Sequence, residues 1–463
     1  MSLISKIFYT STGVLSAGLA LAQSELPNIV FVLADDMGIG DVGSYGQKKI
    51  KTPNIDALSA EGIQFMNHYS GATVSAPSRC SLLTGKHTGH TAIRGNIGVK
   101  LSNGFFDLPI PENEITVAEL LKQRNYATCC VGKWGLGGPS TEGSPLRQGF
   151  DYFFGYLSQG AAHRYYPEYL YENEEKYPLN GAYSHYAIME KGLNFIKKNS
   201  DKPFFAYFAV TPPHADLDIP DLGEYENAFD ETPFINRNPD KGFKTQLKPR
   251  AAYAAMVSEV DNNVGQIIAL LKEKGIYENT IIIFSSDNGV HNVGGHDPDF
   301  FPSNGPFRGH KRDLYEGGVR TPFVFSWPSQ IKQARYSYHI STFWDFLPTV
   351  CDIVGIPYPE GIDGISYLPE LLEKKGQKQH QYLYQEFHEQ GGKQSVFRTD
   401  GWKLIRLNVN KPEKISEELY NIYQDPFESG NVINKYPDIA EELRKEIKNQ
   451  RSYNEFFKFT DKK

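Results

Sequence analysis

Four apolar segments of the chain each end in a cluster of polar or charged residues. One such ending would mean little, because Asp and Asn cap strands and turns in most proteins. Four such endings of different chemistry indicate a ligand site, because ligands gather at the carboxyl ends of strands in open α/β sheets. The four endings are Asp35-Asp36, Gly132-Lys133-Trp134, Thr211-Pro-Pro-His214 and Ser285-Ser-Asp287-Asn288-Gly289.

The side chains that could do chemistry fall into two classes. The first class consists of hard oxygen donors, which suit calcium or magnesium and do not suit a soft metal. The second class is basic or proton-donating and suits an anionic ester whose leaving oxygen gains charge. Together the two classes indicate phosphate or sulfate ester chemistry. The oxygen donors are Asp35, Asp36, Asp287 and Asn288, and the basic groups are Arg79, Lys133, His214 and Lys311.

The stretch from Ser75 to Gly85 reads Ser-Ala-Pro-Ser-Arg-Cys-Ser-Leu-Leu-Thr-Gly. Pro77 is tolerated in the first turn of a helix, so Ser75 is expected just before the helix N-terminus. Backbone N–H groups and the helix dipole favour an anion at that point, and Arg79 can reach a bound oxyanion. Taken alone, Ser75 is better explained as an N-cap serine on an ordinary helix.

This stretch resembles the signature of the type I sulfatases, in particular the bacterial carbohydrate sulfatases with serine at the modified position. Further elements resemble the family and follow in family order, from about residue 27 to about residue 430. Many ordered matches of this kind do not arise by chance. They are Asp35-Asp36-Met37-Gly38, Thr52-Pro53-Asn54-Ile55-Asp56, Gly132-Lys133-Trp134, Pro213-His214, Asp287-Asn288-Gly289, Arg308-Gly309-x-Lys311 and Glu316-Gly317-Gly318-x-Arg320-x-Pro322.

The resemblance implies that Ser75 is oxidised to formylglycine after translation. Serine at this position is similar to the subgroup that a radical, oxygen-independent maturase modifies before export, which is typical of bacteria. The hydrated aldehyde would be a geminal diol whose hydroxyl attacks sulfur. A gem-diol keeps a second hydroxyl that can expel sulfate, whereas a serine sulfate ester would be stable.

The resemblance also implies roles for the other site residues. One Ca²⁺ would be held by Asp35, Asp36, Ser75, Asp287 and Asn288. His214 or Lys311 would protonate the leaving alcohol. Arg79 and Lys133 would hold the geminal hydroxyls and the sulfate oxygens.

One position departs from the family pattern. Many members carry His two places after the lysine of Gly132-Lys133-Trp134, where this chain has Gly135. That His is expected to collapse the diol, so its role is unfilled here. His163 is the replacement candidate, and a structural or substrate-contacting histidine explains it equally well. His291 and His310 are expected to line the substrate pocket.

The alternation of apolar strands with helices predicts an α/β fold: a large mixed, mostly parallel sheet sandwiched by helices, alkaline-phosphatase-like by resemblance. After about residue 375 a charged linker leads into a smaller C-terminal α+β subdomain with an antiparallel sheet. The predicted parts are a signal peptide (1–22), a catalytic domain (23–375) and the subdomain (376–463). Strands are expected at 28–33, 127–131, 203–210, 280–284, 322–325, 382–387, 395–398 and 403–406, helices at 55–62, 116–123, 186–198, 251–274, 343–354 and 438–449, and a surface insertion at 212–249.

The N-terminus and the composition narrow the class of protein. Lys6, an apolar stretch and Ala20-Leu21-Ala22 are typical of a cleaved signal peptide, so we expect a periplasmic or secreted protein. The net charge is −7 and the pI is near 6.0, which argues against a nucleic-acid partner. No further segment is apolar enough to predict an integral membrane segment. The 4 cysteines are too few for a disulfide scaffold, and the adjacent Cys129 and Cys130 are expected to be buried structural thiols.

Export and 13% aromatic residues favour sulfated sugars as substrates. Residues 156–167 look similar to sulfatases that act on galacto-configured sugars. A phosphatase or phosphonate hydrolase on the same fold is the nearest rival, but those enzymes want a second metal for which the sequence shows no ligand set. A non-catalytic binder of sulfated glycans is the other alternative, if Ser75 is never modified. The loops that set specificity leave the sugar and the sulfate position undetermined.

Overall fold

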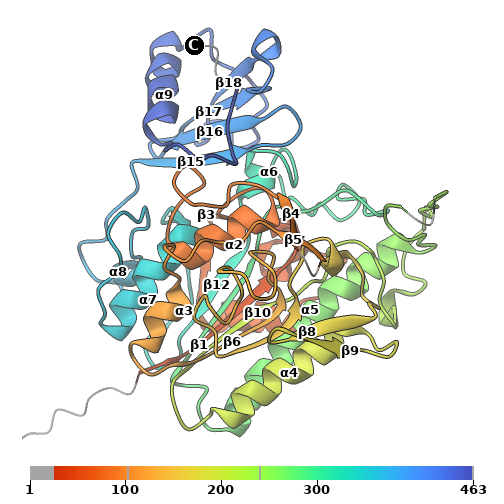
Figure 1. Ribbon diagram of the computed structural model, residues 1–463. Coiled ribbons are helices and arrows are strands. Elements are labelled where there is room, and N and C mark those ends of the chain that lie inside the picture. The colour runs from red at the N-terminus through yellow and green to blue at the C-terminus, as the bar shows by residue number, and fades with distance from the viewer. Residues whose placement is uncertain (1–25, 102–103, 239–240, 461–463) are drawn as a thin grey trace, which may run out of the picture.

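The computed structural model describes residues 26–101, 104–238 and 241–460, so the predicted signal peptide lies outside the described residues. A ten-stranded sheet runs through the larger part of the molecule (Figure 1), in the spatial order β13-β2-β12-β11-β1-β10-β6-β7-β8-β9. Its strands are β1 (Asn28–Ala34), β2 (Ile63–Phe65), β6 (Ala127–Lys133), β7 (Tyr152–Tyr156), β8 (Tyr169–Glu172), β9 (Glu175–Pro178), β10 (Phe204–Ala209), β11 (Thr280–Ser286), β12 (Phe323–Ser326) and β13 (Arg335–Ser337).

The middle of this sheet is parallel, and its borders are antiparallel. Strand β1 pairs in parallel with β10 and β11, and β6 pairs in parallel with β10 and β7. Strands β12 and β8 run antiparallel to β11 and β7. The unbroken apolar runs of β1 and β11 fit this arrangement, because both faces of the central strands are covered. The predicted mixed, mostly parallel sheet is confirmed.

Helices cover both faces of the sheet, and β1 supplies side chains to both layers. Ile29 and Phe31 point into the core shared with α2, α3 and α7, whereas Val30 and Val32 point into the core shared with α1, α4 and α5. Figure 1 shows the two layers on opposite sides of the sheet. The helices are α1 (Pro53–Glu61), α2 (Ser75–Thr84), α3 (Val117–Lys122), α4 (Ser184–Lys198), α5 (Pro249–Glu273), α6 (Glu316–Val319), α7 (Phe346–Val354), α8 (Leu368–Leu371) and α9 (Pro437–Asn449).

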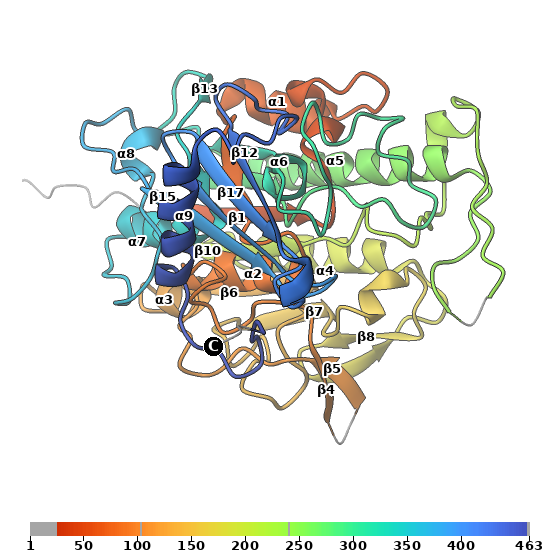
Figure 2. The same cartoon turned by 90° about the horizontal axis from the view of Figure 1, so that it is seen from above.

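A second sheet forms the C-terminal part. Its four antiparallel strands follow one another in chain order, and α9 packs against them, as Figure 2 shows from above. The predicted smaller antiparallel subdomain is therefore confirmed, while the boundary at residue 375 stays a prediction. The strands are β15 (Tyr382–Phe387), β16 (Lys393–Arg398), β17 (Trp402–Leu407) and β18 (Ser416–Asn421), and short pairs elsewhere are β3 (His68–Tyr69) with β14 (Ser341–Thr342) and β4 (Gly98–Leu101) with β5 (Gly104–Asp107).

A buried ionic cluster joins the two parts. Lys403 on β17 donates to Glu316 on α6 at 2.8 Å, and Arg320 forms an ion pair with the same carboxylate at 2.6 Å. Burial opposes ionisation of Glu316, but these two cations hold its pKa well below its usual value. The Glu316–Arg320 motif found in the sequence therefore holds the smaller sheet against the larger one and does not reach the candidate site.

Most predicted elements lie within a few residues of the observed ones, and the main omission is the segment β7–β9. Strands β8 and β9 form a two-residue hairpin whose turn begins at Asn173, which has a φ of 56°. The strands are short and β9 is exposed, so they carry little hydrophobic pattern. Asn173 before a Glu is a weak turn signal that could have revealed them.

Three smaller predictions are also tested. The insertion 212–249 has little regular structure, as expected. Cys129 and Cys130 are free and buried, as expected, and so are Cys80 and Cys351. Within residues 26–101, 104–238 and 241–460, no helix is long and apolar enough to span a membrane.

Candidate active site

The predicted site residues converge at the carboxyl edge of the central strands. Asp35 and Asp36 follow β1, and Asp287 follows β11, its parallel neighbour. Lys133 is the last residue of β6, and His214 lies beyond the end of β10. Parallel pairing places these ends side by side, which the four polar endings in the sequence predicted.

Ser75 lies at the centre of this edge. It is the first residue of α2, so the helix begins one residue earlier than predicted, and Ser75 is not the N-cap. Its hydroxyl donates to Asp35 Oδ1 at 3.1 Å and accepts from Lys133 Nζ at 3.2 Å. The side chain is buried, with 1% of the residue exposed. A carboxylate and an ammonium group thus hold one hydroxyl at a helix N-terminus, which is a position suited to developing negative charge.

Arg79 lies one turn along α2 and faces Asp287. Its Nε and Nη2 both donate to Asp287 Oδ2, at 3.1 and 2.9 Å, and its Nη1 donates to the carbonyl oxygen of Lys133 at 3.0 Å. Burial opposes the charge on Arg79, but the Asp287 carboxylate raises its pKa above the usual value. The guanidinium is therefore committed to Asp287 and to the backbone at Lys133, with Nη2 3.4 Å from Asp35.

Three carboxylates meet beside Ser75. Asp36 donates its backbone N–H to Asp287 Oδ1 at 3.1 Å, and Asn288 donates its amide to Asp36 Oδ1 at 2.7 Å. All of these side chains are fully buried. Burial and the neighbouring Asp35 charge raise the pKa of Asp287 above its usual value. Asp36 has a φ of 63°, a left-handed conformation that Asp tolerates better than most non-glycine residues.

This group has the composition of a site for a hard divalent cation. The buried Oδ1 of Asn288 has no hydrogen-bond partner within the described structure. Ligand atoms of Asp35, Asp36 and His214 lie within 4.8 Å of one another. Carboxylate and amide oxygens are the ligands that Ca²⁺ takes, so the residues fit such an ion. Arg79, Lys133 and Lys311 offset the three carboxylates, and a bound dication would leave the site net positive for an anionic ester.

Lys311 and His214 face the outer side of the carboxylates. Lys311 Nζ donates to Asp36 Oδ2 at 2.7 Å and lies 3.2 Å from His214 Nε2. His214 Nδ1 lies against the carbonyl oxygen of Ala215 at 2.5 Å, which assigns the ring proton to Nδ1 and leaves Nε2 as the acceptor. Burial and the ammonium groups of Lys311 and Lys133 lower the pKa of His214 well below its usual value. With the ring proton on Nδ1, His214 Nε2 is placed to accept a hydrogen bond from Lys311 Nζ.

The other predicted histidines occupy different surroundings. His163 stacks on His214, with ring centroids 4.6 Å apart, and burial together with Lys133 and Lys311 lowers its pKa to about 3. His291 is buried behind His214 and contacts the carbonyl oxygen of Pro213 at 3.1 Å. His310 is partly exposed and lies 3.6 Å from Asp313. His163 thus joins the site, His291 supports its wall, and the contacts of His310 are with Asp313.

Gly135, the departure from the family pattern, has a structural explanation. Its φ is 71°, and a Cβ at this position would lie 1.9 Å from Nε2 of Gln159. Gln159 is 8% exposed, and its Nε2 has no hydrogen-bond partner in the described structure. The backbone N–H of Gln159 donates to Asp107 Oδ2 at 2.6 Å, and burial raises the pKa of Asp107 to about 6. Gln159 therefore fills the space beside Gly135, and sequence reasoning missed it.

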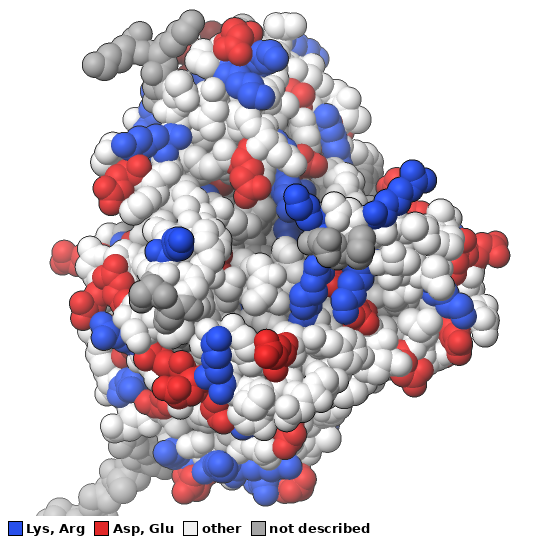
Figure 3. All heavy atoms as spheres, turned by 45° about the vertical axis from the view of Figure 1, so that its right-hand side comes forward, with Lys and Arg blue, Asp and Glu red and all other residues white. Residues whose placement is uncertain are grey.

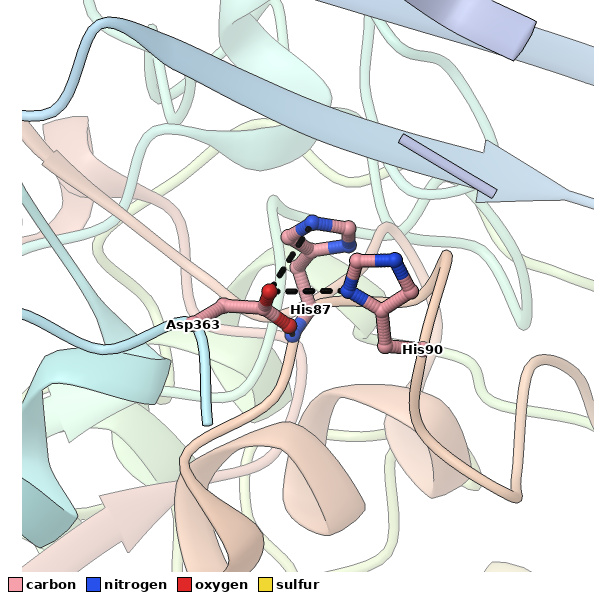
Figure 4. A group of neighbouring side chains, drawn as sticks. All are labelled: His87, His90 and Asp363. Atoms are coloured by element: carbon pink, nitrogen blue, oxygen red, sulfur yellow. Dashed lines mark hydrogen bonds and ion pairs between the residues drawn. The ribbon is translucent and has the colours of Figure 1, made fainter. Parts of the chain in front are cut away.

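A second histidine–carboxylate group, drawn in Figure 4, does not have the character of a metal site. His87, His90 and Asp363 have ligand atoms within 4.8 Å of one another. However, Nδ1 of His87 accepts the backbone N–H of Gly89 at 3.0 Å, which places the ring proton on Nε2, toward Asp363 and toward Gln450. A protonated nitrogen cannot bind a metal. The group ties the loop after α2 to residue 363 and to the end of α9.

Comparison with known proteins agrees with the geometry. The sulfatase family model matches residues 27–356, and a model of the N-sulphoglucosamine sulphohydrolase C-terminal region matches residues 307–453. The N-acetylgalactosamine-6-sulfatase of Canis lupus familiaris is 32% identical over 400 residues, covering 77% of this chain and 68% of that protein. The uncharacterised sulfatase YdeN of Escherichia coli is 31% identical over 408 residues, covering 77% of this chain and 68% of that protein.

Solved structures share the whole fold. The structure of Ps i-CgsB in complex with k-i-k-neocarrahexaose superposes with a TM-score of 0.78 at 27% identity and covers 93% of this chain and 95% of that one. A phosphonate monoester hydrolase of Agrobacterium radiobacter, at 18% identity and a TM-score of 0.66, has the same fold. The superposition covers 92% of this chain and 95% of that one. The fold alone therefore does not separate the two ester classes. The family match and the relatives distinguish sulfate esters from phosphonate esters. This chain belongs to the sulfatase family and is a sulfuric ester hydrolase.

Proposed function

We propose that this sulfatase removes O-sulfate groups from carbohydrates through a formylglycine made from Ser75, with one Ca²⁺. The position of Ser75 carries the proposal. Its hydroxyl lies at the start of α2 between Asp35 and Lys133, at 3.1 and 3.2 Å. A phosphatase of this fold would need ligands for a second metal near the nucleophile. The other described histidine–carboxylate group, at His87, is a structural tie.

Residue 75 would supply the nucleophile. Hydrated formylglycine offers one hydroxyl for attack on sulfur and a second whose deprotonation expels sulfate. Overall, water adds an oxygen to sulfur, the bond between sulfur and the alcohol oxygen breaks, and the alcohol, sulfate and a proton are released. Lys133 Nζ, 2.7 Å from Asp35, stabilises negative charge on the oxygens at residue 75. A maturase of the radical, anaerobic type would have to act on Ser75.

Ca²⁺ would be held by Asp35, Asp36, Asp287, Asn288 and the side chain of residue 75. When bound, it stabilises charge on the nucleophile and on the sulfuryl oxygens. Arg79 keeps Asp287 oriented through two hydrogen bonds, so its role is to position a ligand as well as to add positive charge. The family resemblance implies in addition that Arg79 holds the geminal hydroxyls and the sulfate oxygens.

Lys311 would act as the proton donor to the leaving alcohol. Its Nζ lies 3.2 Å from His214 Nε2, so a proton can pass to the alcohol from Lys311 directly or through His214. His163 covers His214 and, being neutral, does not compete as an acid. We propose that His163 and His291 shape the part of the pocket that receives the sugar, with His310 further out.

The substrate proposal is a sulfated sugar of galacto configuration. Its support is the residue 156–167 stretch and relatives that are named N-acetylgalactosamine-6-sulfatases. Figure 3 shows a face hollowed below the smaller C-terminal part, with Lys and Arg side chains gathered to the right of the hollow. Basic groups around a recess attract anionic substrates. We also propose export to the periplasm or beyond, after cleavage behind Ala22.

Calcium should stabilise the folded protein through the carboxylate group. After EDTA treatment, adding Ca²⁺ at about 100 times its dissociation constant should stabilise the wild type by about 2.7 kcal/mol and raise Tm. Asp36→Asn should abolish that rise, because it removes a ligand charge. Asp363→Asn is the matched control and should keep it. A full rise of Tm with Ca²⁺ in the Asp36 variant, or no rise in the wild type, would contradict the assignment of the calcium site to these carboxylates.

Lys311→Ala should slow only those substrates that need an acid. We expect kcat/KM for a sugar sulfate to fall by about 10²- to 10⁴-fold, and that for 4-nitrophenyl sulfate by far less, because nitrophenolate leaves without a proton. The control Lys332→Ala, at an exposed lysine, should leave kcat/KM unchanged for both esters. Steady-state kinetics on the two esters measures this, and an equal loss on both would refute the acid role.

The sugar preference can be measured with monosulfated galactose, N-acetylgalactosamine and N-acetylglucosamine. Release of inorganic sulfate should be fastest from the two galacto sugars, because the loop that carries His163 borders the catalytic group. Turnover of the gluco sugar alone would leave the sulfatase assignment intact but remove the galacto proposal.

A further inference from the structure

A cavity of about 480 Å³ lies beside the catalytic group, at the end of β7. Strand β7 pairs in parallel with β6, and Tyr156, which lines the cavity, is the partner of Lys133 in that register. Neighbouring strands are about 5 Å apart, so the cavity begins one strand away from the lysine that contacts Ser75. Arg164, also in its wall, directly follows His163. The cavity wall therefore shares two elements with the candidate site: strand β7, which pairs with the strand of Lys133, and the loop that carries His163.

Aromatic side chains form much of the cavity wall. Tyr169 and Tyr171 on β8 pack edge to face, with centroids 5.6 Å apart, so their rings are fixed. Phe105 and Tyr166 stand at the rim with 68% and 38% of each residue exposed. Large exposed aromatics around a concave site are suited to the apolar face of a sugar ring, and tyrosine also offers a hydroxyl. This combination favours a sugar over a purely apolar ligand.

Two cations lie in the same wall. Arg164 pairs with Asp216 at 2.6 Å and Lys244 pairs with Asp218 at 2.8 Å. Both cationic side chains are more than one third exposed, and each keeps N–H groups that its carboxylate does not use. A sulfate or carboxylate on a sugar in the cavity could therefore be recognised without breaking either pair. Glu168 is the acidic residue of the wall.

Gln159 connects the cavity to the catalytic group. Its neighbours Ser158 and Gly160 line the cavity, while its own side chain points at Gly135, two residues beyond Lys133. A buried amide N–H₂ without an acceptor costs roughly 1–3 kcal/mol. That cost is relieved if a hydroxyl or sulfate oxygen of the substrate accepts from Gln159 Nε2, which is otherwise unpaired in the described structure.

We infer that this cavity, the β7–β8 cavity, is a subsite for the sugar next to the one whose sulfate is cleaved. The enzyme would therefore favour sulfated oligosaccharides over sulfated monosaccharides. This inference rests on the proposed carbohydrate substrate and adds where the second sugar binds. Stacking on Tyr166 and Phe105 supplies the affinity, and Arg164 and Lys244 favour an anionic neighbour.

The test compares three substrates: 4-nitrophenyl sulfate, a monosulfated galactose and a sulfated galactan tetrasaccharide. Tyr166→Ala and Phe105→Ala should each raise KM and lower kcat/KM for the tetrasaccharide by about tenfold, which is the size of one lost aromatic contact. Both variants should keep their kcat/KM for the two small esters. Tyr338→Ala, a tyrosine that is 71% exposed and lies after β13 on the opposite edge of the sheet, is the control and should change none.

The outcomes separate this inference from the proposed function. One outcome is that the wild type cleaves the monosaccharide sulfate while both rim variants keep the wild-type kcat/KM on all three substrates. That result refutes the subsite and leaves the proposed function intact. An equal loss of kcat/KM on all three esters also overturns the subsite, because the rim residues would then be needed for the structure of the catalytic group and not for binding a second sugar. A larger loss on 4-nitrophenyl sulfate would mean that the cavity binds apolar leaving groups. If the wild type hydrolyses none of the three, the proposed function and the subsite fall together.

Discussion

Burying three carboxylates at one edge of a sheet is the constraint on which this structure depends. Asp35, Asp36 and Asp287 are fully buried, and an isolated buried charge is very costly. Arg79 and Lys133 approach from α2 and β6, and Lys311 from a loop, so every carboxylate has a cationic partner. The parallel order β11-β1-β10-β6 brings these groups together, and the hydrophobic layers on both faces hold the order.

The same charge pattern explains why Ser75 suits ester chemistry. The cations are already engaged with carboxylates, so they are oriented before a substrate arrives and need little reorganisation. A divalent cation among the carboxylates would turn a balanced group into a positive one. Burial and the nearby ammonium groups of Lys311 and Lys133 also lower the pKa of His214 well below its usual value. The charged side chains that stabilise this edge of the sheet are thus the same ones that we propose to act in catalysis.

Much of this arrangement could be predicted because it is encoded locally. Polar residues directly after apolar strands, such as Asp35 and Asp287, are placed by strand order alone. The contact of Arg79 with Asp287 could not be predicted, because only packing brings its guanidinium against that carboxylate. Gln159 could not be found from the sequence, because its significance depends on a loop after β7 folding back onto Gly135. The hairpin β8–β9 was missed because short, half-exposed strands lack a clear pattern, and the β7–β8 cavity was therefore invisible as well.

Mass spectrometry of the peptide that contains residue 75, from protein purified from its native host, distinguishes formylglycine from serine. We expect a peptide lighter than the serine form by two hydrogens, or its hydrate, in a mature chain that begins after Ala22. Quantitatively unmodified serine in protein that releases sulfate would contradict it, because the hydroxyl held by Asp35 and Lys133 would then be the nucleophile itself.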